Sequence, residues 1–423
     1  MTKPHSSFYT AKKNPPVQYT KSYSKTYGTA WNAAANKEPK YTSDIRINHG
    51  KITPLTEKGK GVELSTEALD LAQNILCRTR PSKDVRTHAF VKEYIVPAVE
   101  QSKHVAYTRT DAYGNFEVVI KHDKAFPTTM FTAHVDTVLP ATDKARYQEV
   151  MYDATAQMFF KTDGRCLGAD DGTGIALMLH MIKSGTPGLY VFFHDEECGR
   201  IGSSAYMAEV KSHKKHAIHH VTKCVSFDRK GDTDIITMQS GRTCASDAFA
   251  SALSTQLHDV SELKYTASPN GSYTDSYTFI DMIPECTNLS VGYKYQHGPS
   301  EEQHIPTFDA MIKALPFIDW EKLPAERDPK KPEPKASFGG YGGYAYDLGA
   351  RSDDLYEYDY IDEYCELVPL EDMEAFASYD VKVDDMSAFI TLYPNLVARV
   401  LVEMGHDIDD LEDAVRALFP KIK

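Results

Sequence analysis

Five short apolar segments of this 423-residue chain each lead to a side chain that can bind a divalent metal. In chain order, these side chains are His134, Asp170, Glu197, Asp228 and His297. Four of the segments are predicted strands, and active sites in open α/β sheets lie beyond the carboxyl ends of strands. Two histidines and three carboxylates that converge there can hold two divalent ions if one carboxylate binds both. The pattern predicts a two-metal hydrolase.

Glu197 belongs to an adjacent acidic pair, Glu196-Glu197, which follows the apolar run Leu189–Phe193. Runs of charge are usually solvated surface loops. A loop that starts at the end of a buried strand, however, is a common place for functional residues. The pair suits a division of labour in which one carboxylate binds metal and the other is the general base, a role typically worth ~10²–10⁴-fold in rate.

His134 and Asp170 each have a simpler alternative role. A lone histidine at a strand end is usually structural, but Asp136 follows two positions later and shares its face of the strand. A metal-binding histidine normally donates its second ring N–H to such a carboxylate. Asp170 lies in the glycine-rich turn GADDGTG, where two consecutive acids would repel a phosphate. The glycines allow the tight turn that would aim Asp170 between two ions. His304 is the competitor of His297, and it lies farther from the preceding strand.

The elements that must position these residues alternate between strands and helices. Strands are predicted at 116–120, 128–133, 189–193, 221–227 and 285–291, and helices at 69–76, 85–101, 172–183, 203–210 and 246–257. This alternation is typical of a mostly parallel sheet with helices on both faces. The predicted fold is therefore α/β, a three-layer αβα sandwich. A capping box at Leu64–Glu67 is expected to open the first helix.

Composition divides the chain into four parts. Residues 1–55 form a basic arm expected to be disordered, since residues 1–60 carry 11 Lys/Arg against 3 Asp/Glu. Residues 56–325 are the predicted catalytic domain, and 326–365 a low-complexity linker. Residues 366–423 form an acidic helical element, within a region (341–423) of 20 acidic and 6 basic residues. Its helices are expected to dock on the catalytic domain or on a protein partner.

Charge, cysteine content and hydropathy exclude several classes of protein. A net charge of −13 and a pI near 5.7 argue against a nucleic-acid-binding protein. The seven cysteines are odd in number and form no CxxC pair, which favours free thiols in a reducing compartment. The first 20 residues lack the apolar stretch of a signal peptide, and no run approaches 18 apolar residues. We therefore expect a cytoplasmic protein that does not associate with membranes.

The segments AHVDTV, GADDGTG, DEECGRIGS, SFDRKG and GYKYQHGPSEE resemble the five signature segments of the co-catalytic di-zinc exopeptidase superfamily. This superfamily includes leucyl-type and tetrahedral aminopeptidases, tripeptidase T, aminoacylases and carboxypeptidases. The resemblance covers roughly residues 60–320. It implies that His134, Asp170 and Asp228 bind one ion, and that Asp170, Glu197 and His297 bind the other. It further implies zinc (with cobalt or manganese as alternatives), Glu196 as general base, Asp136 orienting His134, and a cis Asp170–Asp171 peptide bond.

Spacing within the motifs refines this resemblance. Only 35 residues separate His134 from Asp170 and 68 separate Asp228 from His297, too few for the inserted or lid domains of some members. We therefore expect a minimal catalytic domain and an aminopeptidase that acts on peptides or small amides. An N-acyl amidohydrolase or a carboxypeptidase remains the alternative, and a binding protein on a retired peptidase scaffold is a third. Asp275 is expected either near the site or as a helix cap.

Overall fold

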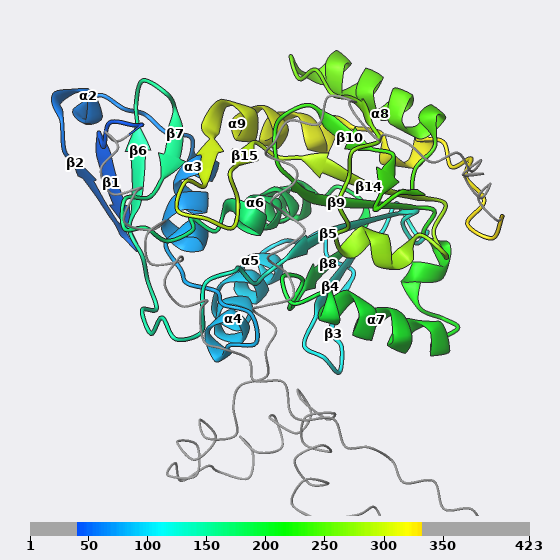
Figure 1. Ribbon diagram of the computed structural model, residues 1–423. Coiled ribbons are helices and arrows are strands. Elements are labelled where there is room, and N and C mark those ends of the chain that lie inside the picture. Colours follow the sequence, from blue (N-terminus) through cyan, green and yellow to red (C-terminus); the bar gives the residue numbers. More distant parts are fainter. Residues whose placement is uncertain (1–39, 332–423) are drawn as a thin grey trace, which may run out of the picture. The chain divides into compact units, whose positions relative to one another are not determined.

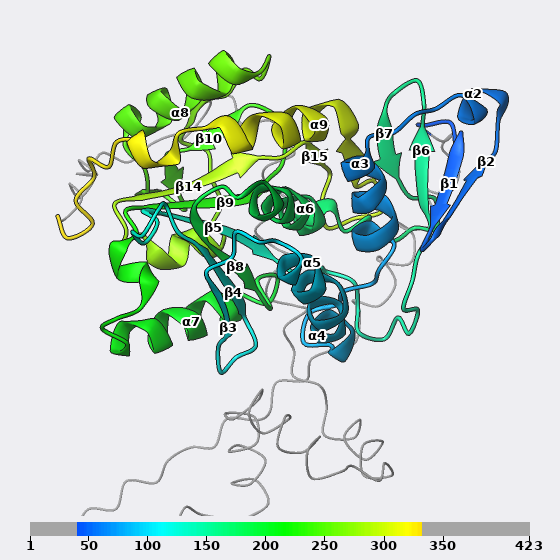
Figure 2. The same ribbon diagram turned by 180° about the vertical axis from the view of Figure 1, so that it is seen from behind.

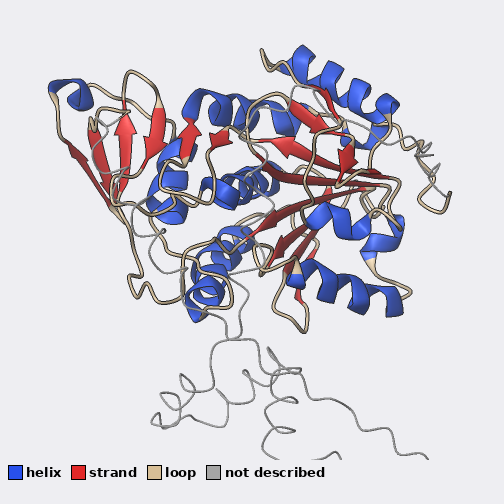
Figure 3. Ribbon diagram, viewed as in Figure 1, coloured by secondary structure: helices blue, strands red, loops and turns tan. Residues whose placement is uncertain are grey.

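The structure is a computed structural model that describes residues 40–331. Among the described residues, Ser43 and those that follow it belong to one unit. The strands of its central sheet are β3 (Tyr107–Thr110), β4 (Phe116–Ile120), β5 (Thr129–His134), β8 (Gly188–Phe193), β9 (Lys223–Arg229), β10 (Asp234–Ile236), β13 (Thr266–Ser268) and β14 (Glu285–Ser290). Their order is β13-β10-β14-β9-β5-β8-β4-β3, and the four central strands β14, β9, β5 and β8 are mutually parallel. Figure 3 draws the strands in red, with helices in blue around them. The α/β prediction is confirmed.

Helices cover both faces of this sheet (Figures 1 and 2). The helices, with η marking short 3₁₀ or π segments, are α2 (Glu57–Lys60), α3 (Thr66–Asp70), η1 (Leu71–Leu76), α4 (Val85–Phe90), η2 (Val91–Ile95), α5 (Val96–Glu100), α6 (Ala169–Ser184), α7 (Ile201–Ser212), η3 (Ala217–His220), α8 (Asp247–Val260), η4 (Asp275–Phe279), α9 (Ile305–Ala314), η5 (Leu315–Phe317) and η6 (Trp320–Lys322). All five helical regions that the sequence predicted are present.

The alternation of side chains along the strands builds two separate cores. On β5, Phe131 belongs to the larger core, to which α3, α5, α6, α8 and α9 also contribute. Met130, its neighbour on the opposite face, packs with α7, η3 and η4. Successive side chains of a strand point to opposite faces, so a buried strand must be apolar throughout. These continuous apolar runs made the central strands predictable from the sequence.

A second sheet lies beside the first and was not predicted. Its strands are β1 (Ile45–Asn48), β2 (Lys51–Pro54), β6 (Val150–Asp153), β7 (Met158–Phe160), β15 (Tyr293–Lys294) and β16 (Glu302–His304). They are antiparallel neighbours in the order β15-β16-β7-β6-β1-β2. Figure 1 shows β1, β2, β6 and β7 beyond α3, away from the central sheet. The interval between His134 and Asp170 thus contributes β6 and β7 to this sheet. A further hairpin joins β11 (Met238–Gln239) to β12 (Arg242–Thr243).

The folded part of the chain extends beyond both predicted boundaries of the catalytic domain. Its start was placed at residue 56, yet β1 and β2 precede that residue, and Ile45 and Ile47 are buried core residues. Its end was placed at 325, yet the backbone N–H groups of Glu326 and Arg327 both donate to Glu285. Residues 1–39 of the arm, 332–365 of the linker and the helical element 366–423 lie outside the described residues.

Local signals near the first helix were only partly correct. Ser65 caps α3, because its hydroxyl accepts from the backbone N–H of Ala68 at 3.0 Å. The third helical residue is therefore Ala68 and not Glu67, so a capping box is not formed.

Six of the seven cysteines lie in the described range, and all six are free thiols. No helix within residues 40–331 is long and apolar enough to cross a membrane.

The β1–β2 hairpin provides a test of the corrected boundary. Ile47 is fully buried, whereas its cross-strand partner Ile52 is 40% exposed. Replacing Ile47 with Ala removes buried methyl groups and should lower the free energy of unfolding by about 2–5 kcal/mol. The matched Ile52→Ala change should cost only about 0.5 kcal/mol. Urea unfolding of both variants measures the difference, and equal losses would contradict the assignment of the hairpin to the folded domain.

Candidate metal centre

The five predicted ligands meet at the carboxyl-end edge of the central sheet. His134 is the last residue of β5, Asp228 is near the end of β9, and Glu196-Glu197 follow β8. These three strands are neighbours in the order β9-β5-β8. Asp170 lies at the start of α6, and His297 lies in the loop after β15. The convergence predicted from the ends of apolar runs is therefore present.

The carboxylate of Asp170 lies between the two histidines. Its Oδ1 is 2.9 Å from His134 Nε2, and its Oδ2 is 3.1 Å from His297 Nε2. Glu197 Oε2 is 3.2 Å from the same His297 nitrogen. Ligand atoms on a tetrahedral zinc ion with bonds of ~2.0–2.2 Å lie about 3.3–3.6 Å apart, close to these separations. This geometry would allow Asp170 to bind two ions at once, which is the role that the sequence predicts for it.

Asp228 completes the His134 side of the cluster. Its Oδ1 lies 3.6 Å from His134 Nε2. Both of its oxygens also accept hydrogen bonds, from the Tyr293 hydroxyl at 2.9 Å and from the Thr274 hydroxyl at 2.5 Å. These two bonds fix the orientation of the carboxylate. Neither Tyr293 nor Thr274 was predicted as part of the site.

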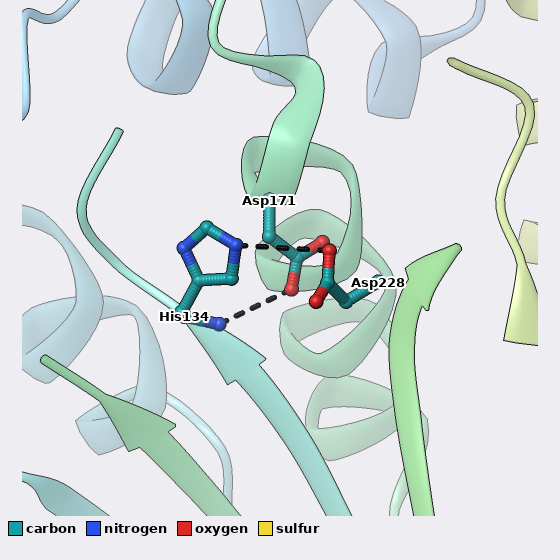
Figure 4. A group of neighbouring side chains, drawn as sticks. All are labelled: His134, Asp171 and Asp228. Atoms are coloured by element: carbon teal, nitrogen blue, oxygen red, sulfur yellow. Dashed lines mark hydrogen bonds and ion pairs between the residues drawn. The ribbon is translucent and has the colours of Figure 1, made fainter. Parts of the chain in front are cut away.

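Asp171 is close to His134 and Asp228 but serves the backbone (Figure 4). One carboxylate oxygen accepts from the N–H of His134 at 3.1 Å, and the other from the N–H of Gly174 at 3.0 Å. Because both oxygens are bound to N–H groups, we assign the bridging role to Asp170. The Asp170–Asp171 peptide bond is cis, as the resemblance implied.

Asp136 contacts His134, the residue that it is predicted to orient, chiefly through its backbone. Its carboxylate lies 3.6 Å from His134 Nδ1, too far for a hydrogen bond, whereas its backbone carbonyl accepts from that nitrogen at 3.0 Å. A proton on Nδ1 leaves Nε2 free to bind an ion. The Asp136 carboxylate instead accepts from the backbone N–H groups of Glu196 and Glu197, at 3.1 and 3.3 Å. It therefore positions the acidic pair, with support from the hydroxyl of Ser82.

The density of negative charge indicates a bound cation. Burial raises the pKa of Glu196 well above its usual range, and Asp228 and Asp275 raise it further. Burial likewise raises the pKa values of Glu197 and Asp228. Burial lowers the pKa of His134, but the neighbouring carboxylates outweigh this and hold it well above its usual range. Glu197 Oε1 is buried and has no hydrogen-bond partner. Such groups are expected to be paired or bound to metal, so the residues fit divalent ions.

Asp275 and His304 can now be placed. Asp275 begins η4 and does not cap it, since Thr274 is the residue before the first turn and makes no capping bond. The Asp275 carboxylate is buried beside the site, and both its oxygens lack hydrogen-bond partners. Burial raises its pKa to about 7. His304 is the residue before the first turn of α9, and its Nδ1 is 2.9 Å from the Thr307 hydroxyl.

Two buried charged residues near the turn of Asp170 were not assigned any role from the sequence. Arg80 is fully buried and donates to three backbone carbonyls of different segments. Glu301 is in the quoted segment GYKYQHGPSEE and accepts from two backbone N–H groups next to Asp170. Burial raises the pKa of Glu301 to about 7, while those N–H groups act in the opposite direction. Only the position of Glu301 inside a recognised segment could have drawn attention to it.

Comparison with known families now adds to the geometry. Residues 115–307 match Peptidase family M28, and this segment contains all five proposed ligands and Glu196. Residues 115–307 are a peptidase family M28 domain. The M28 domain is that of a metal-dependent peptidase, a metallo-hydrolase of the co-catalytic zinc exopeptidase superfamily. The predicted family resemblance is confirmed.

Solved structures similar to this chain are distant in sequence. Aminopeptidase PepT from Bacillus cereus is 12% identical, with a TM-score of 0.49 over 60% of this chain and 97% of that chain. A tripeptidase from Staphylococcus aureus is 12% identical, with a TM-score of 0.47 over 59% and 95%. The Pyrococcus horikoshii TET1 peptidase is 15% identical, with a TM-score of 0.42 over 59% and 98%. Comparison with curated proteins gives no match. The assignment of the M28 domain rests on the sequence match.

The two histidines after β14 allow a test of the ligand set. The full-length protein should bind two zinc-like ions per chain. His297→Ala removes a ligand from one of the two proposed positions, so one ion should be lost on dialysis. His304→Ala removes a histidine of the neighbouring strand β16 and should leave both ions bound. Elemental analysis after dialysis measures the stoichiometry, and equal metal content in the two variants would refute the role of His297.

Proposed function

We propose that the protein is an aminopeptidase in which Glu196 is the general base of a two-metal site. The observation that carries this proposal is the cleft beside the ligands. It is lined by Glu196 together with Asp170, Asp228 and His297. A general base must lie within hydrogen-bond reach of the water it activates, and this cleft gives Glu196 and the ions access to the same small volume.

The reaction needs a nucleophilic water and a proton carrier. Two divalent ions, bound by the His134–Asp170–Asp228 and Asp170–Glu197–His297 sets, would polarise the scissile carbonyl and lower the pKa of a water. Glu196 would take the proton of that water and pass it to the leaving amine. Burial raises the pKa of Glu196 well above its usual range. The N–H bonds to Asp136 hold its backbone in place.

One observation favours a negatively charged group on the substrate. Arg229 and Lys230 line the same cleft as Glu196. Arg229 is held in place by Asp234 and by the carbonyl of Asn270. A carboxylate beyond the scissile bond would suit this cationic wall, whether it belongs to a short peptide or to an N-acylated amino acid. The wall therefore keeps the N-acyl amidohydrolase, or a carboxypeptidase, as the second candidate.

Four substrates separate these candidates. We would measure kcat/KM for alanyl-alanine, alanyl-alanine amide, N-acetyl-alanyl-alanine and N-acetyl-alanine. An aminopeptidase should cleave the first two at least ~10²-fold better than either acetylated compound, because recognition of a buried polar group rejects an analogue that lacks it. Preference for the acetylated compounds would replace the aminopeptidase with the amidohydrolase or carboxypeptidase. If none of the four compounds is cleaved, both candidate functions are contradicted.

Substitutions of the acidic pair test the division of labour. Glu196→Gln removes the base without removing a ligand, so kcat should fall ~10²-fold or more while both ions remain bound. Glu197→Gln, the same change one residue later, should instead lose the ion shared with His297. Initial rates combined with metal analysis distinguish the two phenotypes. If they are exchanged, our assignment of ligand and base is reversed.

A further inference from the structure

Arg80 and Glu301 bind the backbone of the turn that carries Asp170. Arg80 Nη2 donates to the carbonyl of Gly168 at 2.8 Å. The two carboxylate oxygens of Glu301 accept from the N–H groups of Gly168 and Asp170, both at 3.0 Å. Both side chains are almost completely excluded from solvent, with 0% and 2% of their surface exposed. The buried guanidinium of Arg80 thus binds a carbonyl of this turn, and the buried carboxylate of Glu301 binds two of its N–H groups.

The conformation of this turn explains why external partners are needed. Gly168 has a φ of +79°, which favours glycine, and the φ/ψ values of Asp170 and Asp171 are not helical. Buried backbone groups outside regular structure must find partners elsewhere. Arg80 and Glu301 supply them on both sides of Asp170. The direction of the Asp170 side chain therefore depends on residues far away in the sequence.

The same two residues also connect the turn to both histidine segments. Arg80 Nε donates to the carbonyl of Val135, the residue after His134, at 2.9 Å. Glu301 follows His297 by four residues in the same loop, where its own N–H donates to the carbonyl of Gly298. The three segments that carry His134, Asp170 and His297 are therefore linked through one pair of side chains.

We propose that Arg80 and Glu301 form a clamp that sets the position of the bridging carboxylate of Asp170 relative to His134 and His297. Glu301 is then a positioning residue of the metal centre, although it binds neither an ion nor the substrate. The inference rests on the metal assignment of the proposed function. It predicts that loss of the Glu301 carboxylate weakens metal binding more than it weakens the fold.

Glu301→Gln is the sharpest variant. Glutamine has nearly the same shape, so it keeps one acceptor but turns an NH₂ group towards an N–H donor. Changing Arg80 is less informative, because loss of a fully buried cation with three carbonyl partners threatens folding itself. Glu301→Asp keeps the charge but shortens the side chain by one methylene. It should therefore recover part of what glutamine loses.

Glu285→Gln is a matched control. Glu285 is also fully buried, and its carboxylate also accepts from backbone N–H groups, those of Ser246, Glu326 and Arg327. It lies at the start of β14 opposite Lys223, five residues before the level of Asp228 and thus ~16 Å away along the sheet. It shares the burial and bonding of Glu301 but not the contact with the site.

Metal affinity of the full-length variants, measured by competition with a chromophoric zinc chelator, is the decisive readout. Glu301→Gln should weaken zinc binding about 10–100-fold, the usual effect of changing a partner of a ligand. Glu301→Asp should lie between it and wild type, and Glu285→Gln should bind zinc as wild type does. Thermal unfolding of the metal-free proteins should show similar losses for the two glutamine variants. A zinc affinity of Glu301→Gln equal to that of Glu285→Gln would overturn the clamp.

Two further outcomes keep the clamp separate from the proposed function. If Glu301→Gln does not fold, zinc binding by Glu301→Asp decides the question, and wild-type affinity in that variant would refute the proposal. If the wild-type protein binds two ions but cleaves no peptide, the aminopeptidase proposal fails. The zinc affinities would then still test the clamp, because they do not depend on turnover.

Discussion

The position of the Asp170 carboxylate is the constraint on which the rest of the site depends. Its two oxygens face different histidines, 2.9 Å from His134 and 3.1 Å from His297. The two histidines come from separate parts of the fold, since His134 ends a central strand and His297 lies in a loop after β15. A carboxylate that is shared in this way makes the two sides of the cluster interdependent. Hydrogen bonds to the surrounding turn are therefore part of the metal chemistry as well as of the fold.

Charge explains why so many buried bonds surround these residues. Several carboxylates share a volume from which water is largely excluded, and without cations their mutual repulsion would favour protonation or opening of the site. The protein fixes three of them through hydrogen bonds: Thr274 and Tyr293 donate to Asp228, and backbone N–H groups donate to Asp136 and Asp171. Preorganised in this manner, the acids need little rearrangement when ions bind.

The sequence predicted the central sheet, and also that the candidate ligands lie together at its edge, because both depend on strong local patterns. His134 and Asp228 end apolar runs, and a strand that is buried on both faces has a continuous apolar sequence that is easily recognised. The second sheet was missed because its strands have at most four residues and β1 pairs with β6, about a hundred residues away. Arg80 was missed for a related reason. It binds backbone carbonyls, which every residue has, so the residue types around it in the sequence do not indicate these partners. Spacing alone also could not show that the Asp136 atom nearest to His134 Nδ1 is its carbonyl oxygen, with the carboxylate 3.6 Å away.

Solvent access differs sharply between the two sides of the cluster. The His134 side chain is 1% exposed, whereas that of His297 is 41% exposed. Water and competing chelators can reach a ligand at the surface far more easily than one beneath a sheet edge. An ion held by His297 would therefore exchange with the solution faster than an ion held by His134. If two ions bind as proposed, a chelator would therefore remove the ion held by His297 before the ion beside His134.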